Sequence, residues 1–126
     1  MKDSITLVLF DIDGTLLETH GAGRQAFANA LRVVFGSDEE LKRISFAGAT
    51  DLDVFRKIMN DKGHTPTPEE EEAFFRRLPV ELTQTTSAQR VELFPGVREL
   101  LVALSADRRV LLGLVTGNIE ECARIK

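Results

Sequence analysis

Two short apolar runs stand out against the rest of the chain. They cover residues 5–10 (ITLVLF) and residues 110–115 (VLLGLV). Runs of this length and composition are typical of strands buried on both faces of a parallel sheet. Polar residues follow each run directly, DIDGT after the first and TGN after the second. The pattern therefore predicts two buried strands with polar groups at their C-terminal ends.

Between the two runs, apolar residues recur at three-to-four spacing, which predicts amphipathic helices. The first helix has apolar positions between residues 26 and 35 and a stop at Gly36. The second has Thr50 as its N-cap, Asp53 three residues later, and an end at Gly63. Both segments have the length of ordinary helices in globular proteins.

A third helix is predicted from its capping residues. Thr67 is the expected N-cap, Pro68 the first helical residue and Glu70 the partner in a capping box. We expect this helix to end at Pro79, because proline disrupts helix interiors. Residues 83–90 are polar and read as a linker.

Two further helices complete the pattern. One follows Pro95 and Gly96 and leads into the second strand; its inward-facing residues are expected to be Val97, Leu100, Leu101 and Leu104. The other begins at Asn118, the expected N-cap, and continues to the last residue. The predicted order is strand, helical insert, helix, strand, helix, which is an α/β fold.

Composition narrows the class of protein. The chain has 126 residues, of which 43% are hydrophobic and 29% charged, and a net charge of −4. This balance offers no basic surface for nucleic acid or an anionic membrane, and the absence of Trp and Tyr removes the usual stacking platforms for single strands. The single cysteine, Cys122, and the lack of a signal-peptide or membrane-spanning segment favour a cytoplasmic protein with small-molecule partners.

Candidate chemistry gathers at the two strand ends. Asp11 and Asp13 lie two positions apart, so an extended backbone places both on one face, and Gly14 permits a sharp turn after them. Ligands of open α/β sheets bind at this edge. Two adjacent carboxylates repel each other unless a cation lies between them or one is protonated, and Mg²⁺ is the natural hard cation for oxygen ligands.

The second strand end complements the first. Thr116 offers a hydroxyl, Gly117 allows close approach of the backbone, and Asn118 opens a helix whose N-terminus attracts anions. A site that binds a cation on one side and an anion on the other suits phosphoryl transfer. Asp11 would be the nucleophile, and Asp13 would protonate the leaving oxygen and later activate water.

These motifs resemble those of the haloacid dehalogenase-like hydrolase superfamily. Residues 11–16 (DIDGTL) match its first motif and residues 115–118 (VTGN) its second, while residues 94–97 (FPGV) are similar to its usual return from cap to core. Residues 47–51 (AGATD) look like part of the helical cap in the phosphoglycolate phosphatase-like and β-phosphoglucomutase-like branch. The resemblance covers nearly the whole chain.

The resemblance implies a Rossmann-like parallel-sheet core at residues 1–18 and 91–126, with an α-helical cap inserted at residues 19–90. It implies that Asp11 is phosphorylated and Asp13 is the acid/base. Mg²⁺ would be held by the Asp11 carboxylate and the Asp13 main-chain carbonyl. Haloacid dehalogenases proper lack the second aspartate, so Asp13 favours a Mg²⁺-dependent phosphatase acting on a small phosphorylated metabolite.

Two parts of the family pattern are absent before the chain stops: a later lysine, and an acidic pair after another strand. Lys126 is the one candidate for the lysine, but it lies roughly 12 Å along the helix axis beyond Asn118, so a surface lysine is expected. Two parallel strands cannot cover themselves with these helices. We therefore expect the N-terminal part of a longer protein, inactive by itself and prone to self-association through its incomplete core.

Three alternatives remain open. A phosphomutase would use the same aspartates. A signalling receiver domain, which is not an enzyme, would be phosphorylated on Asp51 or Asp53, although neither follows a buried apolar run. A catalytically silent protein of the same fold would bind Mg²⁺ weakly.

Several other residues have both a functional and a simpler interpretation. His20 and the cations Arg24, Arg56 and Lys57 could contact substrate, but solvated surface positions are favoured. Thr50 and Asp51 could line the cap side of the cleft, although helix capping already accounts for them. Cys122 is expected to pack as a small apolar residue beside Ile119.

Overall fold

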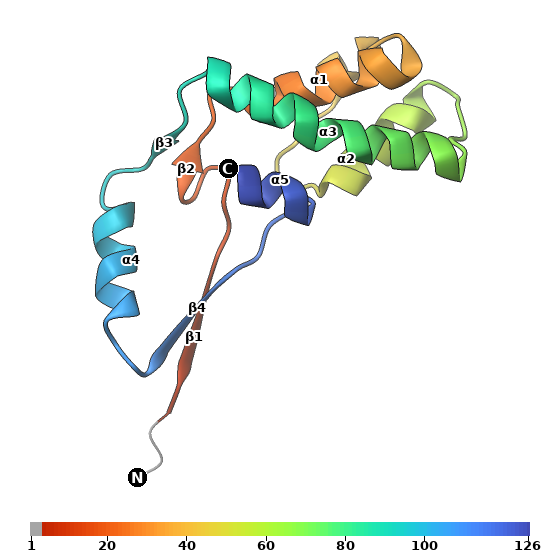
Figure 1. Cartoon of the computed structure of the whole chain (residues 1–126). Helices are drawn as coiled ribbons and strands as arrows, with labels where there is room; N and C mark the ends of the chain where they lie inside the picture. The colour runs from red at the N-terminus through yellow and green to blue at the C-terminus, as the bar shows by residue number, and fades with distance from the viewer. Residues whose placement is uncertain (1–3) are drawn as a thin grey trace.

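The computed structural model describes residues 4–126; residues 1–3 of the expected core segment lie outside the described residues. The chain forms a mixed α/β fold in which most of the helices gather at one end, a pair of strands projects from them, and one helix lies beside the strands (Figure 1). In chain order the elements are β1 (Thr6–Phe10), β2 (Leu17–Glu18), α1 (Ala22–Phe35), the 3₁₀ helix η1 (Glu39–Arg43), α2 (Asp51–Asp61), α3 (Pro68–Ala88), β3 (Glu92–Leu93), α4 (Val97–Ser105), β4 (Val110–Leu114) and α5 (Glu120–Ile125).

Strands β1 and β4 pair in parallel, as their sequence pattern predicts. Their register joins Thr6 to Val110 and Phe10 to Leu114. The pairing continues one residue further, because the N–H of Val115 donates to the carbonyl of Phe10 at 2.8 Å. The polar residues after the two strands consequently start from the same edge of the sheet.

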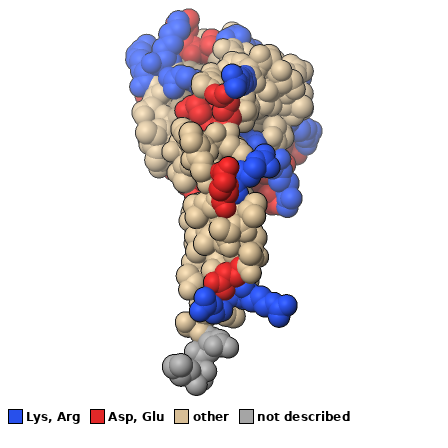
Figure 2. Space-filling model, turned by 90° about the vertical axis from the view of Figure 1, so that its left-hand side faces the viewer, with Lys and Arg blue, Asp and Glu red and all other residues tan. Residues whose placement is uncertain are grey.

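The strands are not buried on both faces, so that expectation is wrong for the described residues. Leu7 is 61% exposed and Leu111 56%. The strand pair belongs to the narrow lower part of the molecule in Figure 2, and the side of this part that faces the viewer carries few charged groups. Helix α4 provides little cover, since Val97 is its only buried residue and Leu100, expected to face inward, is exposed. Two strands and one short helix do not form enough layers to enclose the sheet, as the sequence analysis predicted.

The hydrophobic core lies among the helices instead. Phe27 of α1, Phe55 of α2 and Phe74 of α3 are fully buried, and the rings of Phe55 and Phe74 stack with centroids 4.7 Å apart. Cys122 of α5 packs into the same cluster, with Ile119 against it. The predicted helices α1 and α2 and the predicted packing of Cys122 are thus confirmed.

Helix α3 corrects the sequence analysis. The capping box of Thr67 and Glu70 forms as expected, but the helix continues through Pro79 to Ala88, so residues 83–88 are helical and not a linker. Packing explains the continuation, because Leu82 and Thr85 are buried and the Thr85 hydroxyl donates to the carbonyl of Ala22 in α1 at 2.9 Å. These contacts offset the cost of a proline in the helix interior.

The two connections between the strand pair and the helices pair with each other. β2 and β3 are antiparallel, with Leu17 opposite Leu93 and Glu18 opposite Glu92. Next to them, His20 Nε2 lies 3.0 Å from the Glu92 carboxylate. No helix within residues 4–126 is both long enough and apolar enough to cross a membrane.

Candidate active site

Asp11 and Asp13 are positioned by a tight turn that follows β1. Between them, Ile12 is 3% exposed and its carbonyl accepts from the N–H groups of Thr15 and Leu16 at 3.1 and 2.9 Å. Gly14 adopts φ +75°, a backbone conformation that L side chains rarely adopt. Burial of Ile12 therefore leaves the two carboxylates on the opposite, open side of the turn.

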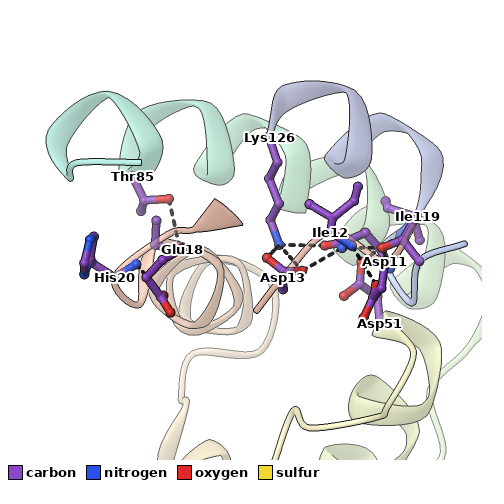
Figure 3. A network of polar contacts seen from close by, with 12 residues as sticks. Asp11, Ile12, Asp13, Glu18, His20, Asp51, Thr85, Ile119 and Lys126 are labelled. Carbon is purple, nitrogen blue, oxygen red and sulfur yellow. Dashed lines mark hydrogen bonds and ion pairs between the residues drawn. The ribbon is translucent and has the colours of Figure 1, made fainter. Parts of the chain in front are cut away.

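Asp13 belongs to a closed polar network with residues from the other end of the chain (Figure 3). Both of its carboxylate oxygens accept from Lys126 Nζ at 2.9 Å, and Oδ2 also accepts from Asn118 Nδ2 at 2.8 Å. Lys126 Nζ donates in addition to Asn118 Oδ1 at 2.7 Å. The cation beside the Asp13 carboxylate is thus an ammonium group of the chain itself.

Lys126 was expected to be a surface residue, and its placement is a correction. Its side chain is only 6% exposed. The distance along a helix axis did not predict this placement, because α5 turns back over the strand ends and Lys126, the residue that follows it, extends towards Asp13 (Figure 3). The signal available in the sequence was a lysine at the end of a helix that begins beside the candidate site.

Thr116 and Asn118 form a second part of this network. Thr116 Oγ1 accepts from Asn118 N at 3.1 Å and from Asn118 Nδ2 at 2.7 Å. Asn118 is therefore not the N-cap of α5 as predicted. The cap position falls on Ile119, whose N–H donates to the carboxylate of Asp51 at 2.8 Å.

The loop after β4 touches the N-terminus of α2. The N–H of Asp51 donates to the carbonyl of Gly117 at 2.8 Å. A Cβ atom at Gly117 would lie 2.5 Å from the carbonyl oxygen of Ala49, so only glycine fits without a shift of the backbone. The close backbone approach expected at Gly117 is present, but the sequence did not show that Ala49 would be the neighbouring residue.

A cavity of about 810 Å³ opens at this edge. Its lining includes Asp11, Asp13, all three residues Thr116–Asn118 and Lys126. A volume of this order is typical of a small-molecule site. The structure thus brings together in one cavity the five predicted site residues, which are Asp11, Asp13, Thr116, Gly117 and Asn118.

The lesser candidates separate into two groups. Arg24 lines the cavity, but its guanidinium donates to the carbonyls of Leu41 and Ile44 and lies 5.0 Å from the centre of the Phe46 ring. His20, Arg56 and Lys57 are not among the residues that line it. Arg24 is held mainly by the helical part of the chain.

Burial changes two titratable groups near the cavity. It raises the pKa of the Asp51 carboxyl, while the hydrogen bond from Ile119 acts in the opposite direction. It also raises the pKa of the Cys122 thiol to about 12, with a further increase from the charge of Asp51. The thiol is therefore protonated at neutral pH and is a poor nucleophile.

The cavity offers carboxylate oxygens, which are ligands that suit Mg²⁺. Among residues 4–126 no three His, Cys, Asp or Glu side chains cluster as a metal site. Mg²⁺ commonly binds through one or two protein oxygens and keeps several waters, so the Asp11 carboxylate and the Asp13 main-chain carbonyl would be a sufficient set for it. Asp11 lines the cavity and is exposed, which fits this role.

The strand-end motifs and the α/β fold are those of a hydrolase family. The sequence matches the haloacid dehalogenase-like hydrolase family over residues 8–125, and the chain belongs to that family. A receiver domain is thereby excluded, and its candidate phosphoacceptor Asp51 is the first residue of a helix. No curated protein matches the sequence.

Solved structures share the fold. CbbY from Rhodobacter sphaeroides in complex with phosphate is similar at 22% identity and a TM-score of 0.72, over 96% of this chain and 55% of that one. A predicted phosphoglycolate phosphatase from Haemophilus somnus is similar at 22% identity and a TM-score of 0.62, over 96% of this chain and 55% of that one. A hydrolase from Pseudomonas syringae is similar at 20% identity and a TM-score of 0.75, over 97% of this chain and 54% of that one. The chain spans about half the length of these solved structures.

Proposed function

We propose that the protein to which this chain belongs is a Mg²⁺-dependent phosphatase of a small phosphorylated metabolite, with an aspartyl-phosphate intermediate. The observation that carries the proposal is the single cavity that joins the two aspartates, the Thr116–Asn118 loop and Lys126. Two structural neighbours add support: CbbY is described in complex with phosphate and, as a variant, with xylulose-(1,5)bisphosphate.

In the first step, Asp11 is the nucleophile. Its Oδ1 atom accepts from the N–H of Ile12 at 2.8 Å, which leaves Oδ2 to attack the phosphorus atom. The bond from phosphorus to the ester oxygen breaks as the new bond forms, and Asp13 donates a proton to the departing oxygen. The products are the alcohol and phosphorylated Asp11.

In the second step, Asp13 takes a proton from water as the water attacks the phosphorus atom. The acyl-phosphate bond breaks, Asp11 is restored, and inorganic phosphate leaves with its oxygens near Thr116, Gly117 and Lys126. A bound Mg²⁺ would supply positive charge that lets the anionic phosphate approach the Asp11 carboxylate.

We also propose that the chain is divided into a core and a cap, as the motifs imply. Residues 1–18 and 91–126 would form the catalytic core, and residues 19–90 would form the helical cap. The antiparallel pairing of β2 with β3 supports a boundary next to these two strands, because the chain passes from the proposed core to the proposed cap and back again at this one place.

Trapping the phosphorylated aspartate tests the proposal. The protein to which this chain belongs is mixed with Mg²⁺ and p-nitrophenyl phosphate, quenched with borohydride, which reduces an acyl phosphate, and mapped by mass spectrometry. We expect modification at Asp11, none in Asp11→Asn, and an unchanged yield in the control Asp53→Asn, which alters an exposed residue outside the cavity lining. Modification at another residue, or its persistence in Asp11→Asn, would contradict the proposal.

A further inference from the structure

We infer that Asp51 is a positioning residue that clamps the Thr116–Ile119 loop to helix α2, so that the loop has its phosphate-binding shape only while α2 is docked against it. This inference rests on the proposed function of the loop as the phosphate site. It assigns to a residue of the predicted cap a direct role in ordering a loop of the predicted core.

The clamp consists of two hydrogen bonds in opposite directions. The main-chain N–H of Asp51 donates to the carbonyl of Gly117, and the side-chain Oδ2 of Asp51 accepts from the N–H of Ile119, each at 2.8 Å. Asp51 and Ile119 are 68 positions apart in the sequence. One residue thus holds both ends of the segment 117–119 (Figure 3 shows the Ile119 contact).

Close packing between the two segments strengthens the clamp. The position that a Cβ of Gly117 would take lies 2.5 Å from the carbonyl oxygen of Ala49 and 3.1 Å from the Cα of Thr50. The backbones therefore meet with no side chain between them. Undocking of α2 would remove this support from the loop.

Local helix capping does not explain the Asp51 carboxylate. Thr50 already caps α2, since its hydroxyl accepts from the N–H of Asp53 at 3.1 Å. Asp53, in the same first turn, is exposed, whereas the Asp51 carboxylate is directed to another element. Burial raises the pKa of the Asp51 carboxyl, so its placement costs free energy that a solvated residue would not lose.

The clamp determines which groups face a phosphate. The N–H of Ile119 is occupied by Asp51 and is not offered to a ligand. Thr116 Oγ1 accepts from Asn118 twice, so its own proton is left to donate. Release of Ile119 would free the backbone of Asn118 and disturb both of these hydrogen bonds.

The test uses the 126-residue chain, inorganic phosphate as the probe with Mg²⁺ present, and three variants. Asp51→Ala removes the side-chain bond, Asp51→Asn keeps an acceptor, and Asp53→Ala is the control with the same loss of charge on the same helix. We expect Asp51→Ala to raise the Kd for phosphate about tenfold and to speed amide exchange at Ile119 by a similar factor. Asp51→Asn should recover most of both effects, and Asp53→Ala should match the wild type.

Each outcome decides the inference. Unchanged phosphate affinity and unchanged Ile119 exchange in Asp51→Ala would overturn it, as would equal losses in Asp53→Ala. Faster exchange with unchanged affinity would also overturn it, because the clamp would then be structural only. If phosphate fails to bind both the wild type and Asp53→Ala, the proposed function fails. The exchange rate of the Ile119 amide then shows separately whether the clamp exists. Amide exchange in α1 and α3 checks that each variant is folded.

Discussion

Lys126 Nζ lies 2.9 Å from each carboxylate oxygen of Asp13, across 113 positions of the sequence. Asn118 bridges the pair from the side, as an acceptor to the lysine and a donor to the aspartate. The three side chains fix one another without a ligand. The orientation of Asp13 is thus set by Lys126, the residue that follows α5, and not by the strand-end turn alone.

Loss of the lysine should therefore impair the site more than loss of a surface charge. In the protein to which this chain belongs, we expect Lys126→Met to lower the rate of p-nitrophenyl phosphate hydrolysis by at least about tenfold, because removal of a buried charged hydrogen-bond partner costs about 1.5–3 kcal/mol. Lys126→Arg should keep part of the rate. Lys57→Met, at an exposed position of α2, is the control; equal rates for Lys126→Met and this control would contradict the role.

Asp13 should matter most for poor leaving groups. In the same longer protein, we expect Asp13→Asn to slow hydrolysis of alkyl phosphates at least about tenfold more than that of activated aryl phosphates, since only the former need a proton at the departing oxygen. The measurement compares kcat/KM for a series of esters with different leaving-group pKa values. Equal losses across the series would count against proton donation by Asp13.

The local elements were predictable because their signals are short-range. The caps at Thr50 and Thr67 formed where the sequence placed them. The continuation of α3 through Pro79 was not predictable, because it depends on burial of Leu82 and Thr85 against α1. A tertiary contact outweighed a local signal there.

In the candidate site, too, some features follow from local sequence signals and others depend on tertiary contacts. The two strand ends were expected to meet, and they do, because parallel strands end at one edge. The contacts of Lys126 with Asp13 and of Asp51 with Ile119 depend on the direction of α5. No periodicity in the sequence encodes that direction.

Cys122 offers a test of burial. Its pKa rises from 9.0 to about 12, so the fold favours the neutral thiol; this contribution to stability is complete below pH 9 and is lost as the pH rises towards 12. At pH 8 we expect a thiol reagent such as Ellman's reagent to react about a thousandfold more slowly with the native chain than with the denatured one. Comparable rates would show that the thiol is accessible.

The aromatic cluster should dominate stability. Phe74 has no exposed surface and its ring stacks on Phe55. We expect Phe74→Ala to lower the free energy of unfolding by about 3–5 kcal/mol, measured by urea denaturation. The control Val33→Ala, at a position that is 57% exposed, should change it by less than about 0.5 kcal/mol.

The strand pair should promote self-association. Within residues 4–126, β1 and β4 pair only with each other, and their apolar side chains face solvent. We expect the mass measured by light scattering to rise with concentration, and the double variant Leu7→Thr, Leu111→Thr to reduce this rise while it keeps strand propensity. A concentration-independent monomer would contradict the prediction.

The pairing of β2 with β3 restricts how the helices can move relative to the strands. Two separate tethers would permit sliding, whereas two tethers bonded to each other define one torsional axis through Leu17 and Leu93. The turn at Ile12 lies close to this axis in the chain, and α2 begins at Asp51 beside α5 and the loop after β4 (Figure 1). Any swing about it that moved α2 relative to β4 would separate Asp51 from Gly117 and Ile119, so rotation of the helices and release of the loop would occur together.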